Sequence, residues 1–220
     1  IFNATNGILL ADGGNHGIVS CFSNFSSIAA DLDDDPNDLE LAAGYTVYKV
    51  KITNLNGIIN NQMIANNVQV DAPHEGYYDG KIAVADINQD GVLDVIIGNC
   101  SSSYTHKNNF PFIYVYSYKN GTYQIYATYR ALNFGIAGNI SIGNIGKKGE
   151  LGIIVTTNRT LHKFSFKGSN VLTRDWVYTF CDDDDCASIG VSLYDFDNDG
   201  IHEIVYRNNK ALVILSAKND

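Results

Sequence analysis

The segment from Asp195 to Glu203 carries oxygen ligands at a spacing that suits a hard cation. Asp195, Asp197 and Asp199 alternate along it, and Glu203 closes it. Ca²⁺ binds about six to eight oxygens at about 2.3–2.6 Å, and alternate side chains of a tight loop can surround one ion. Gly200 follows the third acid, and glycine readily adopts the positive φ that such a loop needs. The segment therefore predicts a calcium loop.

The residues on either side of this segment indicate the elements that must hold it. Residues 191–194 and 204–206 are short and rich in β-branched, aliphatic and aromatic side chains, which is typical of strands. A helix–loop–helix calcium motif would have long amphipathic flanks and a glutamate at its twelfth position, and neither is present. The sequence therefore predicts a strand, a calcium loop and a second strand.

The same pattern occurs at four points in the chain. Residues 84–98 repeat it closely, residues 28–44 repeat it with one inserted residue before the last acid, and residues 141–155 keep the frame without the acids. The motifs begin at residues 31, 86, 144 and 195, a period of roughly 50–60 residues that suits a four-stranded β-blade with long loops. We therefore expect an all-β protein, a β-propeller of four-stranded blades with about four repeats and almost no helix.

Strands can be placed within each repeat. The second repeat predicts strands at 81–87, 92–98, 111–118 and 122–129, with an Asn120-Gly121 turn between the last two. Further strands are expected at 45–52 and 58–65 around Asn56-Gly57, at 160–166 and 171–180, and at 211–215.

The two ends of the chain are out of phase with the repeat. Residues 7–11 and 18–22 resemble strands three and four of a preceding unit, and the last unit stops after its third strand. Either a larger propeller continues beyond both ends, or the N-terminal strand closes a ring of four blades; we favour the larger propeller. The chain begins at Ile1 and not at Met, so residues 1–220 are expected to be a single propeller domain or a propeller fragment.

Composition narrows the class of protein. The net charge is −9, which disfavours binding to nucleic acid phosphates or anionic lipids. No run of apolar residues is long enough to span a membrane, and no secretory signal is visible. An even number of cysteines suits an oxidising, extracellular or cell-surface location, and Cys181 and Cys186 could close a short disulfide loop around Asp182–Asp185. Cys21 and Cys100 could pair with each other, although they lie in different repeats.

Several further residues have both a functional and a structural interpretation. The tyrosines of residues 113–118 and 77–78 could stack on a sugar or peptide, or could fill the blades. The histidines are scattered singly, which favours surface or loop positions over ligand positions. N-glycosylation is possible at six Asn-x-Ser/Thr sequences, which begin at Asn3, Asn24, Asn99, Asn120, Asn139 and Asn158.

The three acidic motifs together resemble the FG-GAP, or integrin-α-like, repeat of β-propellers, including its VCBS variant. The resemblance covers nearly the whole chain and implies an extracellular propeller with Ca²⁺ in about three blade loops. It implies side-chain ligands and one backbone carbonyl in each loop. These are Asp31, Asp33, Asp35, the carbonyl of Asp38 and Glu40; Asp86, Asn88, Asp90, the carbonyl of Val92 and Asp94; and Asp195, Asp197, Asp199, the carbonyl of Ile201 and Glu203.

The third motif departs from the family. Asn144, Gly146, Lys148 and Gly152 stand where ligands are expected, so we predict no calcium there and expect the Lys148 ammonium near that site instead.

The function is harder to infer from this sequence than the fold, because proteins of one fold have many different functions. The sequence has no His-Glu-x-x-His, no Gly-x-Ser-x-Gly and no other catalytic constellation, so we expect no enzyme activity. We expect a calcium-stabilised structural or interaction module in adhesion, scaffolding or filament formation, with a protein partner or a second copy filling its open edge. The alternatives are a propeller that binds a glycan or protein ligand, and the propeller part of a polysaccharide-cleaving enzyme.

Overall fold

The computed structural model describes residues 1–14, 26–69, 79–99, 110–131, 138–157, 159–168, 171–180, 190–208 and 210–217. Within these ranges the chain forms fifteen β-strands and no helix, so the expected all-β class is confirmed. The described residues therefore contain no helix that is long and apolar enough to cross a membrane.

The strands form four antiparallel sheets, and each sheet is built from consecutive strands. Three sheets have four strands and the last has three. The first sheet contains β1 (Ile28–Ala30), β2 (Leu39–Ala43), β3 (Thr46–Lys51) and β4 (Gln62–Asn67); the second contains β5 (Gly80–Ala85), β6 (Asp94–Asn99), β7 (Phe110–Lys119) and β8 (Thr122–Ala131). The third contains β9 (Ile140–Asn144), β10 (Leu151–Thr156), β11 (Thr160–Phe166) and β12 (Leu172–Thr179); the fourth contains β13 (Val191–Tyr194), β14 (Glu203–Arg207) and β15 (Leu212–Leu215).

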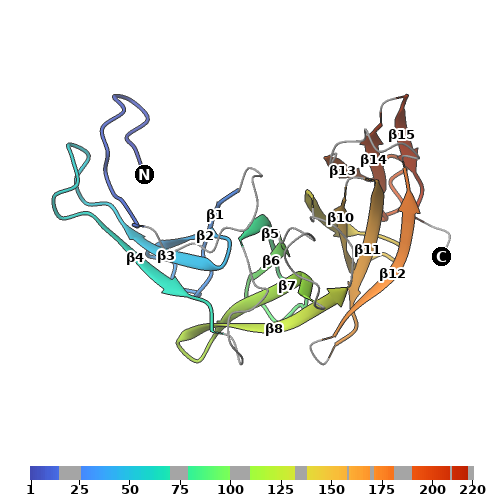
Figure 1. The fold of residues 1–220 in the computed structure, drawn as a ribbon, viewed down its shortest axis with the longest axis horizontal. Coiled ribbons are helices and arrows are strands. Elements are labelled where there is room, and N and C mark those ends of the chain that lie inside the picture. Colours follow the sequence, from blue (N-terminus) through green and yellow to red (C-terminus); the bar gives the residue numbers. More distant parts are fainter. Residues whose placement is uncertain are drawn as a thin grey trace.

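The sheets follow one another in sequence order along an open arc, from the blue N-terminal sheet to the red C-terminal sheet (Figure 1). The first strand of each sheet contacts the first strand of the next, so that β1, β5, β9 and β13 form one row. The fourth strands β4, β8 and β12 also contact one another in order. Each sheet therefore keeps the same orientation relative to its neighbour.

Three hydrophobic cores lie between successive sheets and explain the continuous apolar runs of the second strands. Along β6, Val95 and Ile97 belong to the core shared with the first sheet, whereas Ile96 belongs to the core shared with the third. Along β10, Ile153 and Ile154 face opposite cores in the same way. Side chains alternate across a strand, so a strand that is buried on both faces must be apolar at every position.

Two predicted strands differ from the structure. Residues 7–11 form no strand, and Leu9 makes only an isolated bridge to Phe2. The strand predicted at 58–65 begins at Gln62, because Asn61 holds the preceding residues in a loop. Its side-chain oxygen accepts hydrogen bonds from the Thr53 and Asn54 N–H groups at 2.7 and 2.8 Å. The isoleucines of this loop gave the misleading strand pattern.

Candidate metal centres

Each candidate metal site lies in the loop that joins the first and second strands of a sheet. We call the segments between equivalent ladder pairs the first (31–39), second (86–93), third (144–151) and fourth (195–202) loops; residues 39, 144 and 151 at their ends belong to strands. The residue before each loop pairs across the ladder with the residue after it, as Ala85 does with Asp94 and Tyr194 with Glu203. Gly143 pairs with Gly152 in the same way, so all four loops share one frame.

The acid that follows each acidic loop accepts a hydrogen bond from the second residue of that loop. The carboxylate belongs to the second strand, so this bond ties the loop to the sheet. The three bonds are equal in length: Leu32 N to Glu40 Oε2, Ile87 N to Asp94 Oδ2 and Phe196 N to Glu203 Oε2, each 2.9 Å.

The second and fourth loops also share an internal hydrogen-bond network. Asp86 accepts from the Asp90 and Gly91 N–H groups at 3.0 and 2.9 Å. Asp195 accepts from the corresponding N–H groups of Asp199 and Gly200 at 3.1 and 2.8 Å. The two glycines have φ of 92° and 87°, which favours glycine over any other residue. The first expected ligand of these two loops, Asp86 or Asp195, therefore also shapes the turn.

In the fourth loop, carboxylate oxygens of Asp195, Asp197 and Asp199 all lie within 4.8 Å of one another. Two ligands that are each about 2.4 Å from one ion can be at most about 4.8 Å apart, so this spacing allows a shared cation. The Ile201 N–H donates to Asp199 Oδ1 at 2.8 Å, which positions the third acid. The structure thus brings together three of the ligands expected here, with Glu203 bonded to the same loop.

The first loop brings together Asp31, Asp33 and Glu40 at the same spacing. Glu40 is completely buried, and burial raises its pKa, with further increases from the charges of Asp33 and Asp38. Three buried oxygens of this loop have no hydrogen-bond partner: Asp31 Oδ1, Asp38 Oδ1 and Glu40 Oε1. Buried carboxylate oxygens without a donor are costly, and a bound cation would satisfy them.

Lys49 reaches the first loop from β3, and the sequence interpretation did not include it. Its Nζ lies 3.1 Å from Asp38 Oδ2, 3.3 Å from Asp33 Oδ2 and 4.0 Å from Asp35 Oδ2. Hydrogen bonding to Asp38 is the largest cause that raises the Lys49 pKa. One ammonium cannot balance all the acids of this loop, so the loop remains negative. The register that places Lys49 opposite Glu40 is the signal that could have identified it.

The second loop contains fewer acids, and among the described residues its acids form no cluster of three at that spacing. Asn88 stands at the middle ligand position, and its Nδ2 donates to Asp90 Oδ2 at 3.0 Å. Asp94 is completely buried, and burial raises its pKa to about 6, against a smaller lowering from a hydrogen bond with Tyr126. This loop presents the expected ligand types in a less convergent arrangement.

The third loop lacks the expected ligand acids. We expected the Lys148 ammonium near this site, and the structure shows the Lys148 side chain against Gly200 of the adjacent fourth loop. A Cβ at Gly200 would be 2.7 Å from Lys148 Cδ and 3.0 Å from Nζ. Asn144 and His202 also link the two loops, because the Asn144 N–H donates to His202 Nδ1 at 2.9 Å. Gln89 Nε2 donates to the Gly149 carbonyl at 2.9 Å, so the second, third and fourth loops form a connected row.

Other predicted residues are partly placed. Asn120 is exposed at the β7–β8 turn, whereas Asn99 is buried and donates to the Pro111 carbonyl; glycosylation of the six sequences stays a prediction. His162 is also buried, contrary to the expected surface position. The remaining predictions lie outside the described residues: the strand at 18–22, the four cysteines, Asp182–Asp185, Asn24, Asn158, Tyr77, Tyr78, His16, His74 and His106.

No protein-family model matches the chain, and no curated protein matches it either. The resemblance to FG-GAP and VCBS repeats therefore rests on the motifs themselves and stays a prediction.

Proposed function

We propose that the chain is a calcium-stabilised β-propeller section that works outside the cell as a structural and interaction module. The observation that carries the proposal is the repeated bond from the last acid of each acidic loop to the loop backbone, at Glu40, Asp94 and Glu203. Acids held together repel one another, and a shared cation converts that repulsion into attraction between the two strands. Calcium is proposed as a brace and not as a reactant.

The arrangement of the sheets supports a propeller. Blades of a propeller are four-stranded antiparallel sheets around an axis, with equivalent strands adjacent. Here β1, β5, β9 and β13 follow one another, and each neighbouring pair of sheets shares a hydrophobic core. The three acidic loops and the third loop all join the first and second strands of their sheets. A cation in each acidic loop would therefore stabilise the same point of each sheet.

Calcium titration by isothermal calorimetry on chelator-stripped protein tests the brace. We expect about three calcium ions per chain, and we expect Glu203→Gln to remove or greatly weaken one of them. Glu150→Gln is the matched control, because Glu150 is an exposed acid of the third loop that pairs with Lys147 and is not a proposed ligand. Absence of saturable calcium binding, or equal effects of the two substitutions, would contradict the proposal.

The outward face of the fourth sheet is the proposed interaction surface. Tyr194, Leu212 and Ile214 share this face and are 62%, 71% and 53% exposed. The corresponding face of each earlier sheet is covered by the next sheet, as Ile96 of β6 and Ile154 of β10 show by their complete burial. The complement of such a face is another sheet of the same kind, and for residues 1–220 on their own we propose that a second copy of the chain supplies it head to tail.

Sedimentation velocity over a wide concentration range tests this association. We expect the mass to rise with protein concentration in calcium buffer, and we expect Leu212→Lys with Ile214→Lys to restore the mass of one chain. Both positions are exposed, so these substitutions leave the cores intact. A mass of one chain at every concentration would refute head-to-tail association while leaving the calcium brace untouched.

A second candidate function is recognition of a glycan or protein ligand. The observation that favours it is a charged cavity between the third and fourth sheets, which differs from the interfaces between the other sheets.

A further inference from the structure

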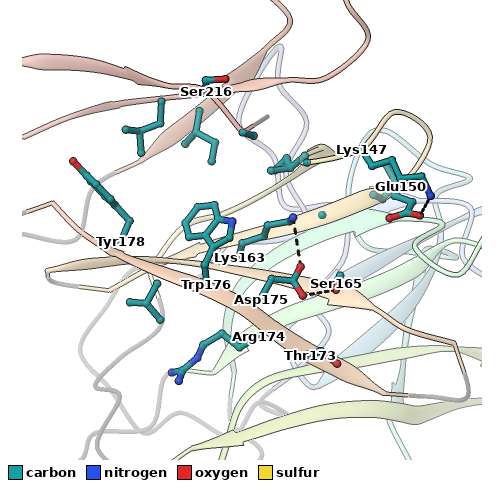
Figure 2. A pocket seen from close by; sticks show the side chains of 18 of the residues that line it. Lys147, Glu150, Lys163, Ser165, Thr173, Arg174, Asp175, Trp176, Tyr178 and Ser216 are labelled. Atoms are coloured by element: carbon teal, nitrogen blue, oxygen red, sulfur yellow. Dashed lines mark hydrogen bonds and ion pairs between the residues drawn. The ribbon is translucent and has the colours of Figure 1, made fainter. Parts of the chain in front are cut away.

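A cavity of about 940 Å³ lies between the third and fourth sheets. Its walls come from the third loop and β10, β11 and β12 with Lys167 on one side, and from residues 204 and 215–217 on the other. Figure 2 shows Lys163 and Trp176 side by side, with Asp175 below them and Ser216 across the cavity. None of these residues belongs to the acidic loops.

The repeat shows that this interface has an unusual composition. Equivalent positions of the third strands, identified by their pairing with the second strands, hold Val47 in the first sheet, Val115 in the second and Lys163 in the third. The valines are completely buried in hydrophobic cores, and Lys163 is also buried at 5% exposure. Across the ladder, Lys163 pairs with Trp176. A buried lysine and a tryptophan thus replace apolar filling at one interface.

Lys163 is held by a small polar network. Its Nζ lies 3.5 Å from Asp175 Oδ2, and Ser165 Oγ donates to Asp175 Oδ1 at 2.9 Å. Lys167 Nζ lies 3.9 Å from the same carboxylate, and its side chain is 56% exposed. Burying an ion pair is costly and often less stabilising than apolar packing, so a purely structural role would favour the valine of the other sheets.

The charges that line the cavity have an excess of positive sign. The lining cations are Lys147, Lys163 and Lys167, against the carboxylates of Glu150 and Asp175; the Arg174 guanidinium lies over the Tyr129 ring of β8 and faces away from the cavity. This excess stands out in a chain whose net charge is −9. A concave site with cations, hydroxyl groups and an aromatic face attracts a small anion that also has an apolar face.

We propose that this cavity binds an anionic sugar unit, a ring that carries a carboxylate or sulfate group. The indole of Trp176 offers a flat surface for the C–H face of the ring. Lys167 is exposed beside the cavity and would donate a charge-assisted hydrogen bond to the carboxylate or sulfate of the ring, while Asp175 holds Lys163 in place. Hydroxyl groups of Thr173, Ser165 and Ser216 line the same space and match the hydroxyls of a sugar. The inference does not depend on calcium in the loops.

Trp176 makes the test direct, because it is the only tryptophan of the chain and its fluorescence reports this site alone. The probes are a galacturonate trisaccharide, a sulfated heparin disaccharide and neutral cellotriose, each titrated in calcium buffer. We expect a saturable change in emission with at least one anionic probe and about tenfold or greater weakening with the neutral one. Saturation-transfer NMR with the same probes is the second measurement, in case binding leaves the emission unchanged.

Variants then locate the binding. Lys167→Ala is expected to weaken anionic binding about tenfold or more without changing the unfolding midpoint, because its side chain is exposed. Lys51→Ala is the control, since Lys51 is exposed at the end of β3 in the first sheet. Absence of binding by both methods at about 10 mM probe, equal affinity for neutral and anionic probes, or an unchanged affinity in Lys167→Ala would overturn the proposal. An emission change that follows protein concentration and not probe concentration would also overturn it, because a second copy would then fill the cavity.

Discussion

The buried imidazole of His162 should give the folding stability a pH dependence that can be measured separately from that of the acidic loops. His162 lies in β11 at 2% exposure, and its Nε2 is 2.7 Å from Thr160 Oγ1. The ring centroids of Phe112 and Phe164 lie 5.4 and 6.2 Å from its own. Burial, with the charge of Arg174 as a smaller cause, lowers the pKa of His162 to about 4.

The sign and size of the effect follow from the two pKa values. An unfolded histidine has a pKa of about 6.5, so between pH 6.5 and 4 the unfolded chain binds a proton that the folded chain excludes. The contribution to stability is therefore fully present above about pH 6.5 and is lost as the pH falls towards 4. A difference of about 2.5 pKa units corresponds to about 3 kcal/mol of unfolding free energy.

Urea unfolding at closely spaced pH values, with calcium held constant, measures this contribution. His162→Leu removes the titrating group. Between pH 7 and 4, the unfolding free energy of this variant should fall by about 3 kcal/mol less than that of the wild type. The absolute stability of the variant is not the readout, because the contact with Thr160 is also lost. Parallel pH profiles for the two proteins would refute the assignment of a neutral buried His162.

The remaining predictions concern the loops. Asp199→Ala should remove the calcium-dependent rise in unfolding midpoint at one site, whereas Lys51→Ala, at an exposed position of the first sheet, should leave the rise intact; calorimetry with and without calcium decides this. Gly91→Ala and Gly200→Ala should each lower the unfolding free energy by about 1–2 kcal/mol, because φ is positive at both, and a neutral effect in urea unfolding would contradict the loop geometry. Lys49→Met should lower the unfolding midpoint of chelator-treated protein and enlarge the midpoint shift that calcium causes, since the acids of the first loop lose their only described lysine partner. An unchanged midpoint would show that Lys49 does not offset their repulsion.

Much of the fold could be predicted because the motif repeats. A single acidic loop is compatible with several structures, but repetition at a constant frame indicates the same strand–loop–strand unit each time. The strand predicted at 160–166 is observed there as β11, and the glycines of the loops adopt the expected positive φ. Local spacing determines these features, so the sequence alone was sufficient.

Features that depend on contacts between distant residues could not be predicted in the same way. Lys49 reaches the first loop only through the β2–β3 register, and Lys148 reaches Gly200 only because two sheets are adjacent. His162 and Lys163 are polar residues in a strand that is buried on both faces, which no local pattern indicates. The cavity beside Trp176 likewise arises from the packing of one sheet on another.

Thermal unfolding in calcium and in chelator tests the central claim most directly. A ligand that binds only the folded state at 100 times its dissociation constant adds about 2.7 kcal/mol per site. For a chain of 220 residues, each kcal/mol raises the unfolding midpoint by about 2–4 °C. We therefore predict that chelation lowers the midpoint by at least about 5 °C and that added calcium restores it. An unchanged midpoint would contradict the proposal that calcium braces these loops.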